Sequence, residues 1–296
     1  MLLDPRKGDA VMAVIDTGSF EQAALRLSLT PSAVSQRVSA LEAELGTPLI
    51  VRGKPCRATS GGQHLLQYLR RTRLLDDEFK AELDERQTMF SVTLAVNNDT
   101  LSTWLLGGLG AFLVEQNILL EILLDDQDHT FTRLAQGQAL AGVSSEPQPL
   151  RGCMVEPLGA MRYRFVAAPA FARRCFPDGL TRAAARRAPV VVFDRKDALQ
   201  SSFLQRVLGL PPGSYPCHYI PATEAFLQAI ELGLGYGMVP EQQLGGRIAS
   251  GALVDMAPDQ PSDVPLYWHA WRVQSAKMER LSEHVIAAAR HILAPL

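Results

Sequence analysis

The clearest hydrophobic period of the chain lies within its first fifty residues. Four apolar side chains from Val34 to Leu45 follow one another at spacings of four, three and four, which predicts one buried stripe along a helix. Thr30 and Pro31, a capping residue followed by proline, mark the start of this helix, and Gly46 marks its end. The pattern therefore predicts a helix of about fifteen residues with one narrow apolar face.

Two further helices are expected before it. Asp4 and Pro5 form another cap followed by proline, and Gly18 ends the helix that they begin. Ser19 and Gln22 have the spacing of a capping box and open a short second helix. Three capped helices in succession predict a small helical domain at the N-terminus.

The third helix carries short polar side chains opposite its apolar stripe. Serine is a poor helix former, whereas a face that meets only water is usually rich in Glu and Lys. Short hydroxyls and an amide allow a helix to lie close in a major groove, so we interpret this face as a DNA-reading surface; a polar face in contact with water alone is the alternative. After this helix, residues 49–59 predict a β-hairpin wing with cations at its turn. The candidate DNA contacts are Thr30, Ser32, Ser35, Gln36, Arg37, Ser39, Arg52, Lys54 and Arg57.

Charge is divided unevenly along the chain. Residues 1–75 hold ten Lys/Arg against six Asp/Glu, so the other 221 residues hold 19 against 25. Between Leu49 and Leu75 there are six cations and no acid. A basic N-terminal segment on an acidic body is expected where only one end of a protein approaches phosphates.

A long helix is expected to join the two parts. After Gly62 neither proline nor glycine occurs before residue 86. Leu65, Leu69, Phe79 and Leu83 form a broken heptad along it, which favours a dimerisation element over a helix packed only on its own domain.

From residue 89 the pattern changes to alternating strands and helices, as in an α/β domain. We expect strands at 91–96, 119–124, 139–143, 163–167, 189–193, 235–239 and 265–271, and helices at 100–115, 224–232 and 277–292. Polar clusters follow several of the predicted strands, and ligands of open parallel sheets bind at the carboxyl ends of strands. Residues 92–160 contain eight acids and only two cations, which favours a cationic ligand, although acids that merely solubilise a surface explain the composition equally well. The candidate ligand contacts are Asn98, Asp99, Thr100, Asp125, Asp126, Ser144, Asp194, Thr223 and Glu224. Asn97 is open to two interpretations, as a ligand contact or as a helix cap.

Other classes of protein find little support. Hydrophobic residues make up 47% of the 296 positions, and no run approaches the roughly 20 apolar residues of a membrane span. There is no Walker, nucleophile-elbow or zinc-protease motif, and the four cysteines lie far apart. We therefore expect a cytoplasmic protein without a signal peptide, without catalytic residues, and without a cofactor or a bound metal.

The segment SFEQAALRLSLTPSAVSQRVSALEAELGTPLIVR resembles the DNA-binding signature of the LysR-type transcriptional regulators. LAVNNDTLSTWLL, LGAMRYRFVAAPAFA, FPDGLTRAAARRAPVVVFDRKD, LGLPPGSYPCHYIPATEAF and PLYWH are similar to members of that family that control basic amino-acid export. The resemblance covers essentially the whole chain.

It implies a winged helix-turn-helix at 1–60, a linker helix at 61–88 and a two-lobed domain at 89–296 like the periplasmic binding proteins. Lobe one would be 89–162 and 268–296, and lobe two 163–267. The implied partners are a dyad of double-stranded DNA, lysine or arginine as effector, a second copy of the chain in a dimer or tetramer, RNA polymerase, and no membrane. The implied target is an exporter gene, and a family member responding to another metabolite is the alternative.

Overall fold

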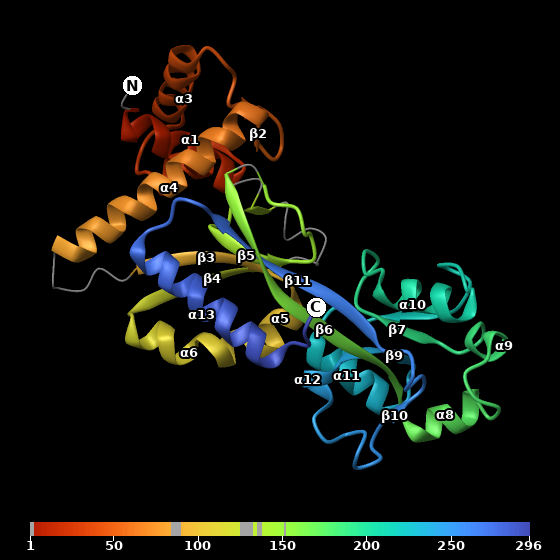
Figure 1. Ribbon diagram of the computed structural model, residues 1–296. Coiled ribbons are helices and arrows are strands. Elements are labelled where there is room, and N and C mark those ends of the chain that lie inside the picture. Colours follow the sequence, from red (N-terminus) through yellow and green to blue (C-terminus); the bar gives the residue numbers. More distant parts are fainter. Residues whose placement is uncertain (1–2, 84–89, 125–132, 135–137, 151) are drawn as a thin grey trace. The chain divides into compact units, whose positions relative to one another are not determined.

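The computed structural model describes residues 3–83, 90–124, 133–134, 138–150 and 152–296 (Figure 1). The chain divides into two compact units. One comprises residues 1–94 with 119–121 and 132–140, and the other comprises 95–118, 122–131 and 141–296.

The first unit begins with the three predicted helices, α1 (Pro5–Thr17), α2 (Phe20–Arg26) and α3 (Pro31–Leu45). Each begins at the predicted cap: the side chains of Asp4, Ser19 and Thr30 accept backbone N–H groups of the first turn. These bonds satisfy donors that a helix start otherwise leaves without a partner. The wing is confirmed as the antiparallel pair β1 (Ile50–Val51) and β2 (Arg57–Ala58). The core beneath these elements is made of buried aliphatic residues, among them Ala10, Val11, Val14, Ala23, Val34, Val38, Leu41 and Leu49.

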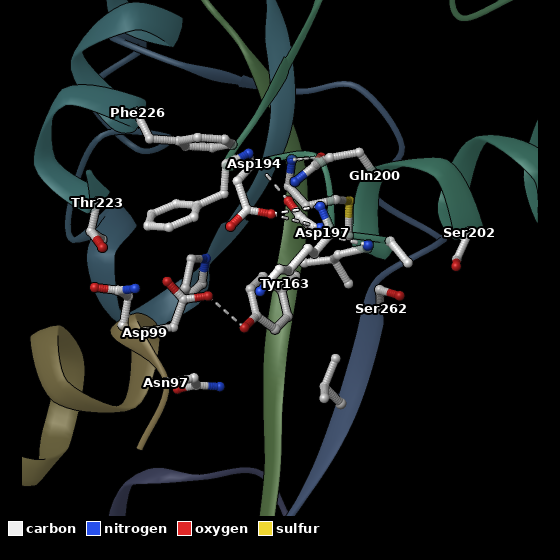
Figure 2. Close-up of a pocket in the computed structure, with 18 of the residues that line it drawn as sticks. Asn97, Asp99, Tyr163, Asp194, Asp197, Gln200, Ser202, Thr223, Phe226 and Ser262 are labelled. Atoms are coloured by element: carbon white, nitrogen blue, oxygen red, sulfur yellow. Dashed lines mark hydrogen bonds between the residues drawn. The ribbon is translucent and has the colours of Figure 1, made fainter. Parts of the chain in front are cut away.

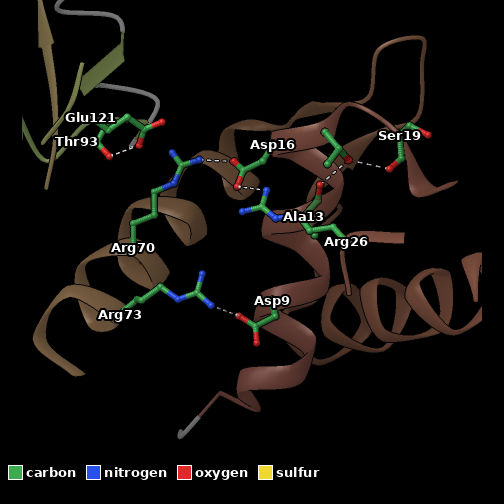
Figure 3. Close-up of polar contacts among 10 residues, drawn as sticks. Asp9, Ala13, Asp16, Ser19, Arg26, Arg70, Arg73, Thr93 and Glu121 are labelled. Atoms are coloured by element: carbon green, nitrogen blue, oxygen red, sulfur yellow. Dashed lines mark hydrogen bonds and ion pairs between the residues drawn. The ribbon is translucent and has the colours of Figure 1, made fainter. Parts of the chain in front are cut away.

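Helix α4 (Ser60–Leu83) follows the wing, and its first half is fixed to α1. Leu65 is buried in the helix-turn-helix core, and Leu69 packs against the same core. Figure 3 shows two ion pairs beside these contacts, Arg70 to Asp16 at 2.5 Å and Arg73 to Asp9 at 3.4 Å. Arg70 and Arg73 belong to the basic stretch between Leu49 and Leu75, but each has a carboxylate partner within the domain.

Another face of α4 remains open. Tyr68, Leu75 and Phe79 are 49%, 45% and 61% exposed, and their spacings of seven and four residues place them along one stripe. The expected heptad was therefore partly wrong. Leu65 and Leu69 stabilise the DNA-binding domain, and Tyr68 rather than Leu69 continues the exposed stripe.

The remaining strands form one mixed sheet of nine strands among the described residues, in the order β4-β3-β5-β11-β6-β9-β7-β8, with β10 beside β6. The strands are β3 (Phe90–Val96), β4 (Ile118–Leu124), β5 (Ala141–Ser144), β6 (Cys153–Ala167), β7 (Val190–Val192), β8 (Cys217–Tyr219), β9 (Tyr236–Pro240), β10 (Val254–Asp255) and β11 (Ser262–Trp271). β7 runs parallel to β8 and β9, whereas β6 runs antiparallel to β9, β10 and β11. The expected open parallel sheet is thus mixed, because two long antiparallel strands run through its middle.

Those two strands, β6 and β11, pair from Tyr163 opposite Ser262 to Cys153 opposite Trp271 (Figure 1). β6 begins ten residues before the predicted strand at Tyr163. Pro157 within it lacks a backbone N–H, and it lies where the register shifts opposite Tyr267, an irregularity that tolerates proline.

Helices cover the sheet of the second unit. They are α5 (Asn98–Thr100), the π-helix η1 (Leu101–Leu105), α6 (Leu106–Glu115), α8 (Pro169–Cys175), α9 (Arg182–Ala185), α10 (Leu199–Leu208), α11 (Thr223–Glu231), α12 (Glu241–Leu244) and α13 (Ala276–Ile292). α5, η1 and α6 follow one another without a break where one helix was predicted, and a π-helical turn of this kind is frequent at functional sites. Within the described residues, no helix combines the length and the apolar character needed to cross a membrane.

Candidate DNA interface and ligand pocket

Helix α3 presents the polar face predicted for it. Ser32 and Gln36 are exposed and Ser35 is half-buried. In the described part of the chain these three side chains have no hydrogen-bond partner. Their hydroxyl and amide groups are therefore free to bond base edges or phosphates.

Three of the other predicted contacts, Thr30, Ser39 and Arg52, already have structural partners. The Thr30 hydroxyl accepts the backbone N–H of Ala33 at 3.2 Å, as the cap of α3. Arg52 donates to the Ser39 hydroxyl at 3.4 Å and lies over the ring of Phe20. This cation is thereby held beside the reading helix rather than extended from the wing.

Lys54, Arg57 and Arg37 complete the predicted set. Lys54 and Arg57 are exposed on the wing, and Arg37 is half-buried on α3. Across the described residues neither Arg37 nor Arg57 has an ion-pair or hydrogen-bond partner. An unpaired, exposed arginine on a wing is suited to contact phosphates in any sequence.

We expect Gln36→Ala and Arg57→Ala to separate these roles. Loss of the Gln36 amide should weaken binding to the specific site by roughly 1–3 kcal/mol, because a base-edge contact is lost. Loss of Arg57 should weaken binding to all sequences alike. It should also reduce the slope of log affinity against log salt concentration by about one. Filter binding with specific and random DNA at several salt concentrations measures both, and equal losses on both DNAs for both variants would contradict this division.

The second unit contains a cavity of about 350 Å³ (Figure 2). This volume is in the range of small-molecule sites. The start of α5, strands β6, β9 and β11, the loop after β7, and helices α10, α11 and α12 contribute to its wall. Its polar lining residues are Asn97, Asn98, Asp99, Tyr163, Asp194, Lys196, Asp197, Gln200, Ser202, Thr223, Gln243 and Ser262.

At the start of α5, Asn97 and Asp99 lie on one helical turn. Asn97 caps the helix, since its Oδ1 accepts the backbone N–H of Thr100 at 2.7 Å. Oδ2 of Asp99 accepts the hydroxyl of Tyr163 at 2.7 Å. Burial raises the pKa of Asp99 to about 6; the Tyr163 bond opposes this shift and the charge of Asp197 adds to it.

The loop after β7 supplies two more carboxylates. Oδ1 of Asp194 accepts the backbone N–H groups of Lys196 and Asp197, at 2.7 and 3.1 Å. Both oxygens of Asp197 are also bonded within the loop, to the N–H groups of Phe193 and Leu199. Burial raises the pKa of Asp197, and these hydrogen bonds oppose the shift. Asp197 therefore shapes the loop, while Oδ2 of Asp194 has no partner among the described residues.

These three carboxylates give the cavity a negative charge. Lys196, which is exposed, is the one cation among the described lining residues. None of the three carboxylates forms an ion pair with a described residue. Half-buried carboxylates without a counterion favour a cationic ligand, because an ammonium or guanidinium group would replace the water that they lose.

Four of the nine predicted ligand contacts line this cavity: Asn98, Asp99, Asp194 and Thr223. Three do not. Thr100 is buried inside the helix, the Ser144 hydroxyl accepts the N–H of Glu146, and Glu224 is exposed on α11. Asp125 and Asp126 lie outside the described residues.

Tyr163, Asp197 and Gln200 were missed. Tyr163 begins a predicted strand, and only the tertiary fold brings its hydroxyl to Asp99. Gln200 is 2% exposed on α10, and its Oε1 accepts the N–H of Met238 at 2.7 Å. The Asp-x-x-Asp spacing of Asp194 and Asp197 was the available signal for the second carboxylate. Among the described residues no cluster of His, Cys, Asp or Glu could hold a metal ion.

A winged helix-turn-helix followed by an α/β domain with a small-molecule cavity defines a DNA-binding regulator that responds to a ligand. Residues 7–63 match the family described as "Bacterial regulatory helix-turn-helix protein, lysR family", and residues 85–290 match the "LysR substrate binding domain". The chain belongs to the LysR family of transcription regulators.

Known proteins similar to this chain match it over almost its full length. ArgP of Aeromonas salmonicida is 43% identical over 288 residues, which are 97% of this chain and 96% of that protein. The crystal structure of ArgP from Mycobacterium tuberculosis has a TM-score of 0.88 at 39% identity, with complete coverage of both chains. Full-length LysG from Corynebacterium glutamicum with bound effector Arg has a TM-score of 0.81 at 36% identity, covering 99% of this chain and 100% of that one.

Proposed function

We propose that this regulator senses a basic amino acid, lysine or arginine, in the cavity of its second unit. The observation that carries the proposal is the set of carboxylates on the cavity wall, Asp99, Asp194 and Asp197, which have no described cationic partner. The bound arginine named for LysG of Corynebacterium glutamicum supports the same class of ligand. The chain would act in this way without catalytic activity.

Two carboxylate oxygens are best placed to bind the cations of such a ligand. Oδ1 of Asp99 and Oδ2 of Asp194 have no hydrogen-bond partner among the described residues, whereas both oxygens of Asp197 are bonded within the loop. A dibasic ligand that reaches both residues would connect the start of α5 with the loop after β7. Asp197 would contribute by holding that loop and by adding negative potential.

Asp194→Asn tests this proposal, with Glu224→Gln as a matched control. Both variants remove one negative charge, but only Asp194 lines the cavity. We expect Asp194→Asn to weaken arginine binding by roughly 1.5–3 kcal/mol, the range for a charge-assisted hydrogen bond, with Glu224→Gln unchanged. Titration calorimetry measures both, and equal affinities in the two variants, or no heat with either amino acid in the wild type, would refute the assignment.

We further propose the domain boundaries 1–60, 61–88 and 89–296, with lobe one at 89–162 and 268–296 and lobe two at 163–267. The family matches at 7–63 and 85–290 support the division between the DNA-binding domain and the effector domain.

The exposed stripe of α4 supports a dimer that reads a DNA dyad and can pair into a tetramer. We also propose that the regulator controls a gene for amino-acid export and that it contacts RNA polymerase. The four cysteines lie far apart in the sequence, which supports a reducing cytoplasm.

A further inference from the structure

Asn97 presents to the cavity a polar group that the fold does not use. Its side chain lines the cavity although the residue is only 4% exposed. Because Oδ1 accepts the N–H of Thr100 at 2.7 Å, the orientation of the amide is fixed and Nδ2 is turned away from the cap. Within the described residues Nδ2 has no acceptor. An N–H donor on the cavity wall that the fold leaves unused is available to a molecule that enters the cavity.

Asp99, two residues later on the same turn, offers the complementary atom. Its Oδ2 is occupied by Tyr163, while Oδ1 has no described partner. Figure 2 shows Asn97 and Asp99 on the same side of the cavity, with Asp194 on the opposite side. An amide donor next to a carboxylate acceptor matches the head group of an amino acid, whose carboxylate accepts hydrogen bonds and whose ammonium donates them.

We propose that Nδ2 of Asn97 binds the α-carboxylate of the ligand and makes this residue decide between a basic amino acid and a linear diamine of the same length. The inference rests on the proposed function. Asp99 then binds the α-ammonium, and Asp194 binds the cation at the end of the side chain. One amide group thus has both roles: its oxygen caps the helix, and its nitrogen binds the ligand.

The charges of the cavity explain why the choice depends on Asn97. Lysine and 1,5-diaminopentane share both ammonium groups and differ only in the carboxylate. The carboxylates Asp99 and Asp194 attract the two ligands alike, and with Asp197 they repel the carboxylate of lysine. Lys196 is exposed, and exposed ion pairs contribute little. A neutral hydrogen-bond donor on the cavity wall is therefore needed to bind the carboxylate of lysine, and Nδ2 of Asn97 is a donor that the fold leaves unused.

Asn97→Asp tests the inference without removing the cap, because aspartate caps helices as well as asparagine does. Its second oxygen would face the cavity in place of Nδ2. We expect the Kd of lysine to rise by at least about 30-fold, whereas the Kd of 1,5-diaminopentane should stay the same or fall, since a donor becomes a negative acceptor. Asn97→Ser, which also keeps a capping oxygen, should raise the Kd of lysine by about fivefold and leave that of the diamine unchanged.

Titration calorimetry on the full-length protein measures both ligands, and urea denaturation checks that each variant folds. Gln228→Glu adds the same charge at an exposed position of α11 away from the cavity and should leave the ratio of the two affinities unchanged. If Asn97→Asp changes both affinities by the same factor, the inference is wrong and the amino-acid site stands. If the wild type binds neither lysine nor arginine, the proposed function fails first and the inference fails with it.

Discussion

At pH 8, Asp99→Asn is expected to stabilise the protein against urea and, at the same time, to remove most of its affinity for a basic amino acid. Burial raises the pKa of Asp99 from 3.8 to about 6. The stability that this group contributes is present below pH 3.8 and is lost as the pH rises through 6. Its ionised form therefore costs on the order of 2–3 kcal/mol of folding free energy at pH 8. Asparagine removes that charge and still offers an oxygen to the hydroxyl of Tyr163.

Urea denaturation of the ligand-free protein should show a gain of about 1–3 kcal/mol for Asp99→Asn at pH 8 and little difference near pH 4. Arginine binding by the same variant should fall by about 10- to 100-fold, because one cation loses its carboxylate. A variant that binds as well as the wild type, or that gains no stability at pH 8, would contradict the role assigned to Asp99.

The same carboxyl group predicts a pH dependence of ligand binding. Only the ionised form pairs with a cation, so a group with a pKa of about 6 should weaken arginine binding by roughly tenfold between pH 7.5 and pH 5. The cavity is also lined by other titratable residues, Tyr163, Asp194, Lys196 and Asp197. A pH dependence in the wild type alone therefore does not identify the group that titrates, and the variant is needed for comparison. The tenfold change should be absent from Asp99→Asn; if it persists there, another of these groups titrates.

The helices of the DNA-binding domain could be predicted closely because their signals are local. Asp4, Ser19 and Thr30 cap their helices through bonds to residues two or three positions away, and such bonds depend on little besides the sequence nearby. The stripe from Val34 to Leu41 is buried for the same reason: its spacing alone places it on one side of α3.

The mixed sheet could not be predicted in the same way. The pairing of β6 with β11 joins residues about one hundred positions apart. Proline is rare inside strands, so with Pro157 the first part of β6 has the sequence pattern of a loop. The side chains of Arg162 and Asp263 bond across this pair at 2.7 Å, a contact invisible in the local pattern.

The ligand pocket was predicted in part for a related reason. Asp99 and Asp194 follow strands and were found by that position, whereas Tyr163 comes from the middle of a long strand. Ser144 is the last residue of β5, but its hydroxyl accepts the backbone N–H of Glu146 in a local turn. The side of a strand or turn on which a residue lies decides whether it reaches the cavity, and that depends on the register of distant strands.

Phe79→Glu is expected to give a folded monomer whose affinity for a dyad operator is reduced by at least about 100-fold. The side chain is 61% exposed on α4, so a charge there costs the isolated chain little. In a dimer that pairs through Tyr68, Leu75 and Phe79, the same charge would enter an apolar seam without a partner. Each helix-turn-helix would then read a single half-site, and the gain from linking two sites, about 10²–10⁴-fold, would be lost.

Sedimentation equilibrium measures the mass, and filter binding to a two-half-site operator measures the affinity. Phe79→Leu is the matched control, because it keeps an apolar side chain at the same place and should remain dimeric. Leu69→Glu should behave differently from both: Leu69 packs on the helix-turn-helix core beside Gly8, so its charge should unfold the DNA-binding domain. Intact dimers of Phe79→Glu with full operator affinity would place the interface on another surface, since an unpaired carboxylate in the seam of α4 could not be accommodated without separating the helices.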